Sequence, residues 1–405
     1  MPKHRIRRAL LTVVLLLAIL SGCLVVALRA ALPDTFYTTD QGGTFHIASM
    51  PWVTVQEGPA QTAQVGRTNA DTSRNVTLAL FGTIPIKTVR TVDTESRSVQ
   101  VCGTPFGIKM FSDGALVVAF SDQYTALGTE NPAKEAGLKL GDLIVSAAGR
   151  SIRSNEELTQ AITAAEGKPI SLVYRRDGQQ YTTTLTPVAD AATGAYRAGI
   201  WVRDSSAGIG TMTFLDPLNG TFGGLGHAIS DTDTGADITL LSGEIVPVMI
   251  TGCVSGTAGS PGELRGEFSA AAAGNVLAND ATGVYGAYTG AAAGQSCPVA
   301  QPQQIALGDA EIWTTISGST PKRYHVRIER VNMTSGDPNR NLLIKVTDPE
   351  LLAATGGIVQ GMSGSPLVQN GRLIGAVTHV LVNDPTRGYG IFATAMLEKA
   401  DAVVP

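Results

Sequence analysis

Residues 361–366 read Gly-Met-Ser-Gly-Ser-Pro, a turn that presents Ser363 between residues with little or no side chain. Gly361 can adopt positive φ, which would let the backbone amides before and at Ser363 point into one pocket. A serine nucleophile needs such a backbone, donors for the developing oxyanion, and a base that takes its proton. The turn therefore predicts a candidate catalytic serine, provided that a suitable histidine lies elsewhere in the chain.

The residues after the turn predict a β-hairpin. Residues 366–369 and 372–377 are strand-like, and they flank Asn370-Gly371, a dipeptide typical of a two-residue hairpin turn. Ser363 therefore opens a hairpin. Glycine- and serine-rich runs are more often ordinary turns, so the motif alone does not establish catalysis. Ser365 is the rival nucleophile, but the Pro366 that follows suits the start of a strand better than an oxyanion hole.

The composition predicts a β-rich chain of two or three domains. The chain has 405 residues, a hydrophobic content of 43%, 46 glycines and only 5% aromatic residues, which suits turn-rich cores. A net charge of −4, without a basic stripe beyond the first eight residues, argues against a nucleic-acid partner. The four cysteines lack metal-type spacing, so no metal or other cofactor is expected, and a Cys253–Cys297 disulfide and free thiols both remain open.

The N-terminus predicts a membrane anchor. Residues 1–8 are basic, and residues 9–28 form an uncharged run that would span roughly 30 Å as a helix. The positive flank favours cytoplasmic residues 1–8, a transmembrane helix over residues 9–28, and an extracytoplasmic remainder. A cleaved signal peptide is one alternative. A lipoprotein processed at Cys23 is another, because Leu20-Ser-Gly-Cys23 matches a lipoprotein cleavage box.

The segment after the anchor divides into two parts. Residues 29–75 are polar and poor in large apolar side chains, which predicts a loosely ordered arm. Residues 76–81 and 84–89 are strand-like and separated by Gly82, so a β-rich connector is expected over residues 76–99.

Residues 100–188 have the pattern of one compact unit. Strand-like segments come first, and Ser154 and Glu157 then form a capping box for a helix over residues 155–165. Two further strands flank Asp177-Gly178 as a tight hairpin.

This unit resembles a PDZ domain of the bacterial protease-associated type. The resemblance rests on Ala136-Gly137-Leu-x-x-Gly141-Asp142-Leu-Ile, on Gly149 and on the expected helix. It implies that a peptide adds as a strand beside residues 108–111, with its terminal carboxylate held by one backbone loop. That loop comprises Thr104, Pro105, Phe106, Gly107 and Ile108. An internal loop or the chain's own residues are alternative ligands.

The remainder, residues 189–405, predicts a second β-rich unit. Strand-like segments recur at turn-like intervals, for example at residues 248–251, 311–316 and 324–331, which favours a barrel or a sandwich. Residues 267–296 are rich in alanine and glycine. A weak strand or two is expected there, around residues 284–288, and much of the rest is expected to be loop.

Two of the five histidines suit an active site. His227 follows the glycine-rich turn at residues 223–226, where its ring can face a cleft and act as a base. His379 lies in a continuous apolar run and is expected to be a strand or pocket-lining residue. The other three lie in unsuitable positions: His4, His46 and His325.

Asp348 is the best candidate for the acid that orients the base, because it lies 15 residues before Ser363. The Asp348-Pro349 pair is also typical of a helix N-cap, so a structural role is the alternative. Four other acids remain open, namely Asp231, Asp233, Asp237 and Asp384.

Together, four segments resemble the sporulation-stage serine proteases of the stage IV sporulation protein B family. These segments are residues 226–231, 347–349, 357–366 and 375–385. The resemblance implies a mostly β chain with an anchor, a PDZ domain over residues 100–188 and a chymotrypsin-like double β-barrel over residues 189–405. It assigns His227 as base, Asp348 as acid and Ser363 as nucleophile, with the amides of Gly361 and Ser363 as oxyanion hole.

The same resemblance implies a function. A membrane-anchored endopeptidase would act in the space between mother cell and forespore, and no cofactor is implied. Its substrate would be the exposed part of a membrane-bound regulator, whose cleavage lets an intramembrane protease activate a late sigma factor. Self-cleavage would fall in the arm at residues 30–75. An inactive PDZ scaffold and a lipid-anchored surface binding protein are the alternatives from other classes.

Overall fold

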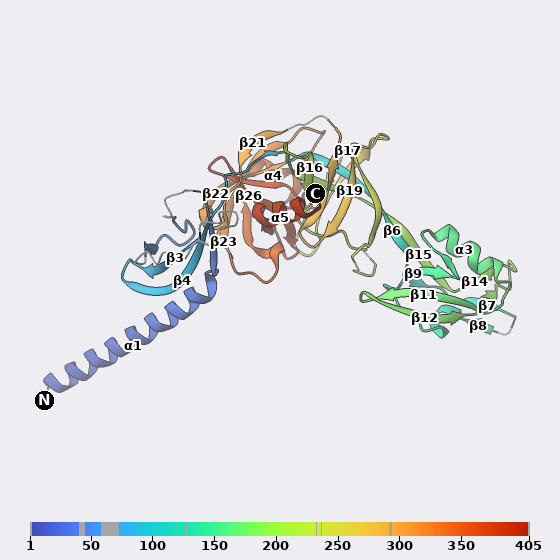
Figure 1. The fold of residues 1–405 in the computed structure, drawn as a ribbon, viewed down its shortest axis with the longest axis horizontal. Coiled ribbons are helices and arrows are strands. Elements are labelled where there is room, and N and C mark those ends of the chain that lie inside the picture. Colours follow the sequence, from blue (N-terminus) through green and yellow to red (C-terminus); the bar gives the residue numbers. More distant parts are fainter. Residues whose placement is uncertain are drawn as a thin grey trace, which may run out of the picture.

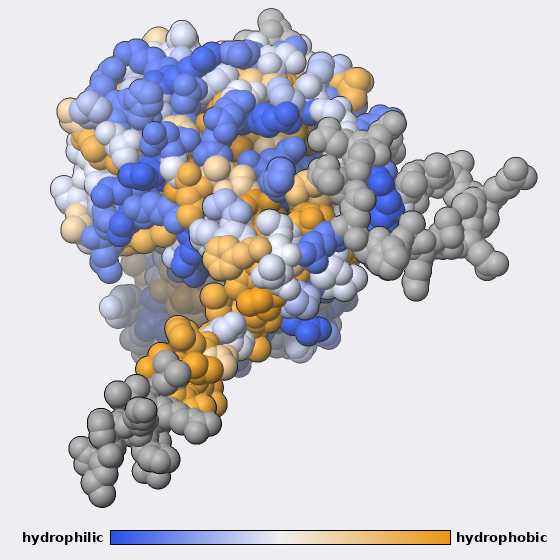
Figure 2. Space-filling view, turned by 90° about the vertical axis from the view of Figure 1, so that its left-hand side faces the viewer, coloured by the Kyte–Doolittle hydropathy of each residue, from blue (hydrophilic) through white to orange (hydrophobic). Residues whose placement is uncertain are grey.

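The computed structural model describes residues 2–39, 45–57, 73–126, 128–231, 233–235, 237–290 and 294–403. Helix α1 (Pro2–Ala31) projects from the body of the molecule (Figure 1). Its segment Leu11–Ala31 has a mean hydropathy of 2.9 and stands exposed as an apolar rod (Figure 2). The helix is long and apolar enough to cross a membrane, although a signal sequence would share these properties.

A small sheet lies where α1 meets the body, in the region expected to be an arm. Its strand order is β1-β4-β3-β2, and Leu32, Phe36 and Leu78 are buried in its core. The two strands before residue 73 are only four and five residues long, so their alternation is too short to mark them in the sequence. The strands are β1 (Thr35–Thr38), β2 (Val53–Glu57), β3 (Ser73–Leu80) and β4 (Ile84–Asp93). Residues 40–44 and 58–72 of the expected arm lie outside the described residues.

Six strands form a first barrel. They pair as a ring, from β6 through β17, β19, β20, β16 and β15 back to β6. Their bounds are β6 (Pro105–Phe120), β15 (Ile200–Leu215), β16 (Thr221–Gly224), β17 (Leu240–Val254), β19 (Gly274–Asp280) and β20 (Gly283–Tyr288). Phe106, Met110 and Phe222 are buried inside the ring. Strand β20 matches the weak strand expected around residues 284–288, whereas β19 occupies part of the segment that was expected to be loop.

Short strands extend this sheet along its outer side. Strand β18 (Glu263–Phe268) pairs with β17, whereas β5 (Ser98–Val101) pairs with both β15 and β21 (Gln295–Pro298). The first barrel therefore includes residues before position 100, although the sequence placed the start of the peptidase unit at residue 189.

A second barrel closes from the C-terminal strands. Its ring is β22 (Gly308–Thr314), β23 (Lys322–Val331), β24 (Leu342–Val346), β27 (Asp384–Phe392), β26 (Arg372–Leu381) and β25 (Pro366–Gln369). β25 and β26 flank Asn370-Gly371, so the predicted hairpin is confirmed. Helix α4 (Pro349–Thr355) leads to the loop that carries Ser363, and α5 (Ala393–Val403) ends the described chain. Cys253 and Cys297 are free thiols.

The PDZ-like unit interrupts the first barrel. β6 and β15 each start or end in the barrel and continue beyond it, where β6 pairs with β9 (Leu143–Ala147), followed by β11 (Ile170–Arg176) and β12 (Gln179–Leu185) (Figure 1). Helices α2 (Pro132–Glu135) and α3 (Asn155–Ala164) complete this unit. The Ser154 hydroxyl accepts a hydrogen bond from the Glu157 amide at 3.1 Å, as predicted for the start of α3.

Candidate active site

The turn that carries Ser363 is fastened to both barrels. The Thr211 amide of β15 donates to the Ser363 carbonyl at 2.9 Å, and the Thr211 hydroxyl donates to the Gly361 carbonyl at 2.8 Å. From the second barrel, the Val377 carbonyl accepts a hydrogen bond from the Gly364 amide at 2.8 Å. The turn is therefore held rigidly at the junction of the two barrels.

Close packing explains why glycine follows Ser363. Gly364 has a φ of +89°, and a Cβ added there would lie 2.1 Å from the Thr211 carbonyl oxygen and 2.3 Å from the Leu225 nitrogen. A larger residue would break the contact between the turn and the first barrel.

The two serines of the motif have different surroundings. Ser365 has no exposed surface, and its hydroxyl lies 3.0 Å from that of Thr314. Ser363 is partly exposed and lines a cavity of about 660 Å³ between the barrels. Its hydroxyl donates to the Thr378 carbonyl at 2.9 Å. Only Ser363 of this pair can therefore reach a substrate.

Backbone donors are available beside Ser363. Among the residues that the structure describes, neither the Gly361 amide nor the Ser363 amide has a protein acceptor. Gly361 has a φ of +96°, the positive value that its position in the sequence predicts. Two amides without partners next to a reachable hydroxyl are what an oxyanion hole requires.

His227 lines the same cavity as Ser363 and lies in the loop that follows strand β16. Its Nδ1 atom lies 2.7 Å from the Ala228 carbonyl oxygen, so Nδ1 carries the proton in the neutral ring and Nε2 is left as the base. Burial lowers the pKa of His227, and the Ala228 carbonyl and the charge of Asp237 oppose that shift. His227 is thus a neutral base at pH 7.

His379 also lines this cavity, in agreement with the expectation of a strand or pocket-lining residue. It lies on β26, and its ring stacks on His227 with the ring centroids 4.7 Å apart. Burial, the neighbouring His227 and Arg340 lower the pKa of His379 to about 4, against the opposing charge of Asp337.

The structure does not bring Asp348 to His227, which departs from the predicted triad. The Asp348 carboxylate caps α4, where it accepts hydrogen bonds from the amides of Glu350 (2.9 Å), Leu351 (3.2 Å) and His325 (3.1 Å). Burial acts to raise the pKa of Asp348, but these amides outweigh it and the pKa is lowered. Asp348 does not line the cavity that holds Ser363. The Asp348-Pro349 pair therefore serves as a helix N-cap, the structural role that the sequence analysis gave as the alternative to catalysis.

Two side chains near His227 have no clear signal in the sequence. Asp237, one of several acids left open, lines the cavity and accepts a hydrogen bond from Ser230 at 2.6 Å. Asn279 holds the loop after His227, because its side chain bonds both the amide (2.8 Å) and the carbonyl (2.9 Å) of Ile229. Asn279 reaches the site through long-range strand pairing, which a local pattern does not reveal, whereas Asp237 is placed by a bridge to Ser230 within the loop itself.

The family follows from a comparison with protein-family models. The model for the SpoIVB peptidase S55 family matches residues 194–397, and a PDZ-domain model matches residues 108–186. The chain belongs to the SpoIVB peptidase S55 family. The resemblance found in the sequence is thereby confirmed, and this S55 member has a PDZ domain in a mostly β fold.

Relatives outside the family model match only parts of the S55 member. Serine protease HTRA1 of Xenopus tropicalis is 41% identical over 14% of this chain and 12% of its own length. A suspected zinc metalloprotease of Bartonella henselae is 34% identical over 22% of this chain and 24% of its own. The chain thus spans about a quarter or less of the curated relatives it matches. The Rv3671c protease from M. tuberculosis, in its active form, covers 49% of this chain and 74% of its own at 16% identity, with a TM-score of 0.30.

The PDZ peptide loop was predicted at the wrong place. Residues 104–108 lie at the start of β6, inside the first barrel, and residues 106–108 pair with β15 on one side and β17 on the other. A peptide strand cannot add there, because both edges are already occupied. A cavity of about 500 Å³ lies instead between α3 and residues 198–202, where Leu158, Ile162 and Ile200 line it. No described strand pairs with that edge of β15.

Proposed function

We propose that this S55 member is a serine endopeptidase in which Ser363 is the nucleophile and His227 is the general base. One observation carries the proposal: Ser363 and His227 line a single cavity between two barrels, where the serine also lies beside two unpartnered amides. The Ser363 hydroxyl must rotate from the Thr378 carbonyl towards His227, a small change of the kind expected between the free and substrate-bound states.

The chemistry follows from these positions. His227 Nε2 takes the proton of the Ser363 hydroxyl while Oγ bonds to the peptide carbonyl carbon. The amides of Gly361 and Ser363 hold the resulting oxyanion, and losing one such donor typically costs about 2.7–4 kcal/mol of transition-state stabilisation. The imidazolium then gives its proton to the leaving amine, and water releases the acyl group by the reverse steps.

In this proposal the cation that forms on His227 is stabilised by the Ala228 carbonyl and by Asp237. The carbonyl bonds Nδ1 directly, and the charge of Asp237 favours the protonated ring. Asp348 contributes by capping α4, which precedes the Ser363 loop. It is thus a positioning residue, and the acid of the predicted triad is replaced here by groups of the first barrel.

The biological role is proposed from the family and from α1. The enzyme is anchored by α1, with its catalytic part in the space between forespore and mother-cell membranes. It cleaves the exposed part of a membrane-bound regulator, which lets an intramembrane protease activate a late sigma factor. The PDZ domain binds a protein or peptide partner. The enzyme also cleaves itself between residues 30 and 75. Mass spectrometry should therefore detect fragments that begin in this segment for the wild-type protein, and none for S363A.

A fluorophosphonate probe tests the chemistry of the site directly. We expect the full-length protein to be labelled, S363A and H227A to lose labelling, and S365A to keep it in whatever fraction folds. Because Ser365 is buried and hydrogen-bonded, S365A should lower the free energy of unfolding by about 1–3 kcal/mol. Labelling that persists in S363A, or that does not need His227, would refute the assignment.

A further inference from the structure

Strand β15 belongs to both the PDZ domain and the first barrel. Ile200 and Val202 pack against the PDZ core, whereas residues 206–211 pair with β6 inside the barrel. Between these parts, the pairing register shifts from Arg203 to Ser205. Such a bulge bends a strand and increases its twist. The two units therefore meet at Arg203.

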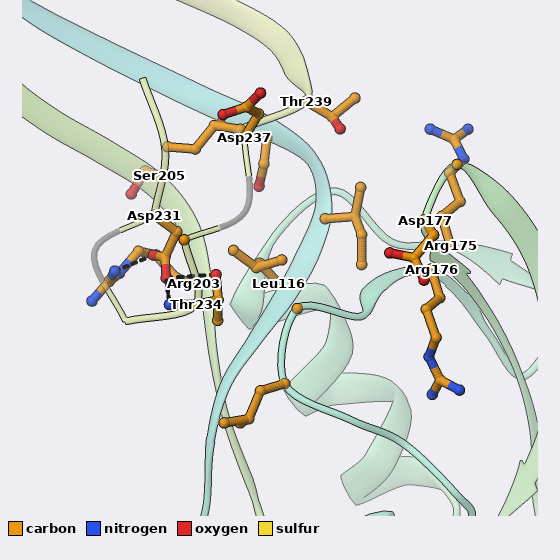
Figure 3. Close-up of a pocket in the computed structure, with 17 residues that line it drawn as sticks. Leu116, Arg175, Arg176, Asp177, Arg203, Ser205, Asp231, Thr234, Asp237 and Thr239 are labelled. Atoms are coloured by element: carbon orange, nitrogen blue, oxygen red, sulfur yellow. Dashed lines mark hydrogen bonds and ion pairs between the residues drawn. The ribbon is translucent and has the colours of Figure 1, made fainter. Parts of the chain in front are cut away.

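The Arg203 side chain crosses this junction to the loop that follows His227 (Figure 3). Its guanidinium donates to the Asp231 carboxylate and, at 2.7 Å, to Asp233. The Asp231 side chain has no exposed surface. It also accepts hydrogen bonds from the amide and the hydroxyl of Thr234, at 2.9 and 3.0 Å. The ion pair therefore fixes a turn of the His227 loop to the PDZ side of the molecule.

A backbone hydrogen bond also crosses the junction, because the Asp113 amide donates to the Thr239 carbonyl at 3.1 Å. A cavity of about 530 Å³ separates Leu116 and Arg175 of the PDZ domain from Asp231, Thr234 and Asp237 of the loop (Figure 3). Among the residues that the structure describes, Arg203 is the one cation that forms an ion pair with this loop, because Arg175 and Arg176 pair with other aspartates. Arg203 therefore supplies the charged contact between the PDZ side and the His227 loop.

Loss of this pair would move His227. A buried carboxylate without its cation is strongly destabilising, so the loop would shift to hydrate Asp231. Asp231 follows His227 by four residues, and His227 is held by its bond to Ala228 and by the Asn279 contacts to Ile229. A shift of this short loop changes the position of the imidazole relative to Ser363.

The same part of β15 forms one wall of the PDZ groove. Gly199, Ile200 and Trp201 line the groove opposite α3. A peptide that adds as a strand along this edge would bond the backbone directly beside Arg203.

We propose that Arg203 is a positioning residue that couples occupancy of the PDZ groove to His227. A peptide strand beside residues 199–202 changes the bend of β15 at its bulge, and the Arg203–Asp231 pair carries that change to the His227 loop. The inference rests on the proposed peptidase function, because the reactivity of Ser363 is its first readout.

A double-mutant cycle tests the contact in the full-length protein. R203Q and D231N should each lower the rate of fluorophosphonate labelling about tenfold, because displacements of about 1 Å can cost up to 10²-fold. The double variant R203Q/D231N should be labelled no more slowly than either single variant, since both substitutions act through one contact. R203K keeps the positive charge and should be labelled faster than R203Q. K109Q breaks a partly exposed pair with Glu244 on the neighbouring strand and should label normally. Folded R203Q that labels at the wild-type rate would overturn the proposal.

A peptide tests the coupling without relying on the fold of R203Q. The probe is a decapeptide with a free C-terminus, selected from a random library for binding to the wild-type protein. It must not bind the T159W variant, in which the tryptophan fills the groove. It should change the wild-type labelling rate at least threefold and leave that of R203Q unchanged while still binding to it. Bound peptide that leaves the wild-type rate unchanged, or that alters both rates equally, contradicts the coupling.

Hydrogen exchange provides a readout that does not need catalysis. The Ile229 amide bonds Asn279, so its exchange reports the order of the His227 loop. R203Q and the peptide should each change this exchange, and K109Q should not. Wild-type protein that is never labelled would refute the peptidase proposal alone. Unchanged exchange would refute the role of Arg203.

Discussion

The imidazole rings of His227 and His379 stack with their centroids 4.7 Å apart and their planes tilted by 33°. The two rings come from different barrels, on β16's following loop and on β26. Two protonated rings this close would repel each other. Burial lowers the pKa of both rings, and the neighbouring His227 lowers the pKa of His379 further. The stack is therefore a pair of neutral rings at pH 7, with Nε2 of His227 ready to accept a proton.

The pH dependence of Ser363 labelling should follow His227. Because the reaction needs the neutral ring, the rate should rise with pH, with a midpoint below the ordinary histidine pKa of about 6.5. Asp237 raises the pKa of His227, so D237N should move the midpoint to still lower pH, whereas D309N, far from this cavity, should leave it unchanged. A rate–pH profile of the three proteins checks this, and a D237N midpoint at higher pH would contradict it.

Substitutions of Asp348 should separate a helix cap from a catalytic acid. Asparagine and serine are good N-caps, so D348N and D348S should keep labelling rates within a few-fold of wild type. D348A should lose about 0.5–2 kcal/mol of unfolding free energy. A triad acid, by contrast, would lose about 10⁴ in rate on change to asparagine. A loss of that size in folded D348N would restore Asp348 to the triad.

The glycine after Ser363 should tolerate no side chain. G364A places a methyl group 2.1 Å from the Thr211 carbonyl oxygen, and the strain and overpacking should cost at least about 2 kcal/mol. G336A is the matched control, because nothing lies within 4 Å of a Cβ added at that exposed position. Denaturant unfolding should show the loss for G364A and little change for G336A. Equal stabilities would mean that the turn is not held as described.

Two PDZ variants should behave in opposite ways. T159W should fill the groove beside α3 and abolish peptide binding with little effect on folding, because Thr159 is exposed. G107E should disrupt the first barrel, since a Cβ at Gly107 already lies 2.8 Å from Phe268 and Val246. Fluorescence polarisation and thermal unfolding measure the two effects. Peptide binding lost in well-folded G107E but kept in T159W would support residues 104–108 instead.

Local signals in the sequence predicted the local structure well. The Asn370-Gly371 hairpin, the cap at Ser154 and the Asp348-Pro349 helix start all depend on residues a few positions apart. Turn and cap preferences act at that range, so they are visible without an alignment.

Long-range pairing limited the prediction of the site. Residues 104–108 read as the first strand of a PDZ domain, but they pair with residues beyond position 200 in the barrel. The family motif identified Ser363 and His227 as partners, and the structure places both at one cavity. Nothing local could show that Asp348 does not line this cavity, or that Arg203 reaches Asp231.

The shared strands β6 and β15 also constrain how the chain can fold. The barrel cannot close until both strands are side by side, and the whole PDZ sequence lies between their paired ends. An unfolded PDZ segment would act as a long loop with its own closure entropy, whereas a folded one brings the two strands together in advance. Closure of the first barrel, which supplies His227, is therefore favoured only once the inserted PDZ domain has folded. An active hydrolase is thereby disfavoured early in synthesis.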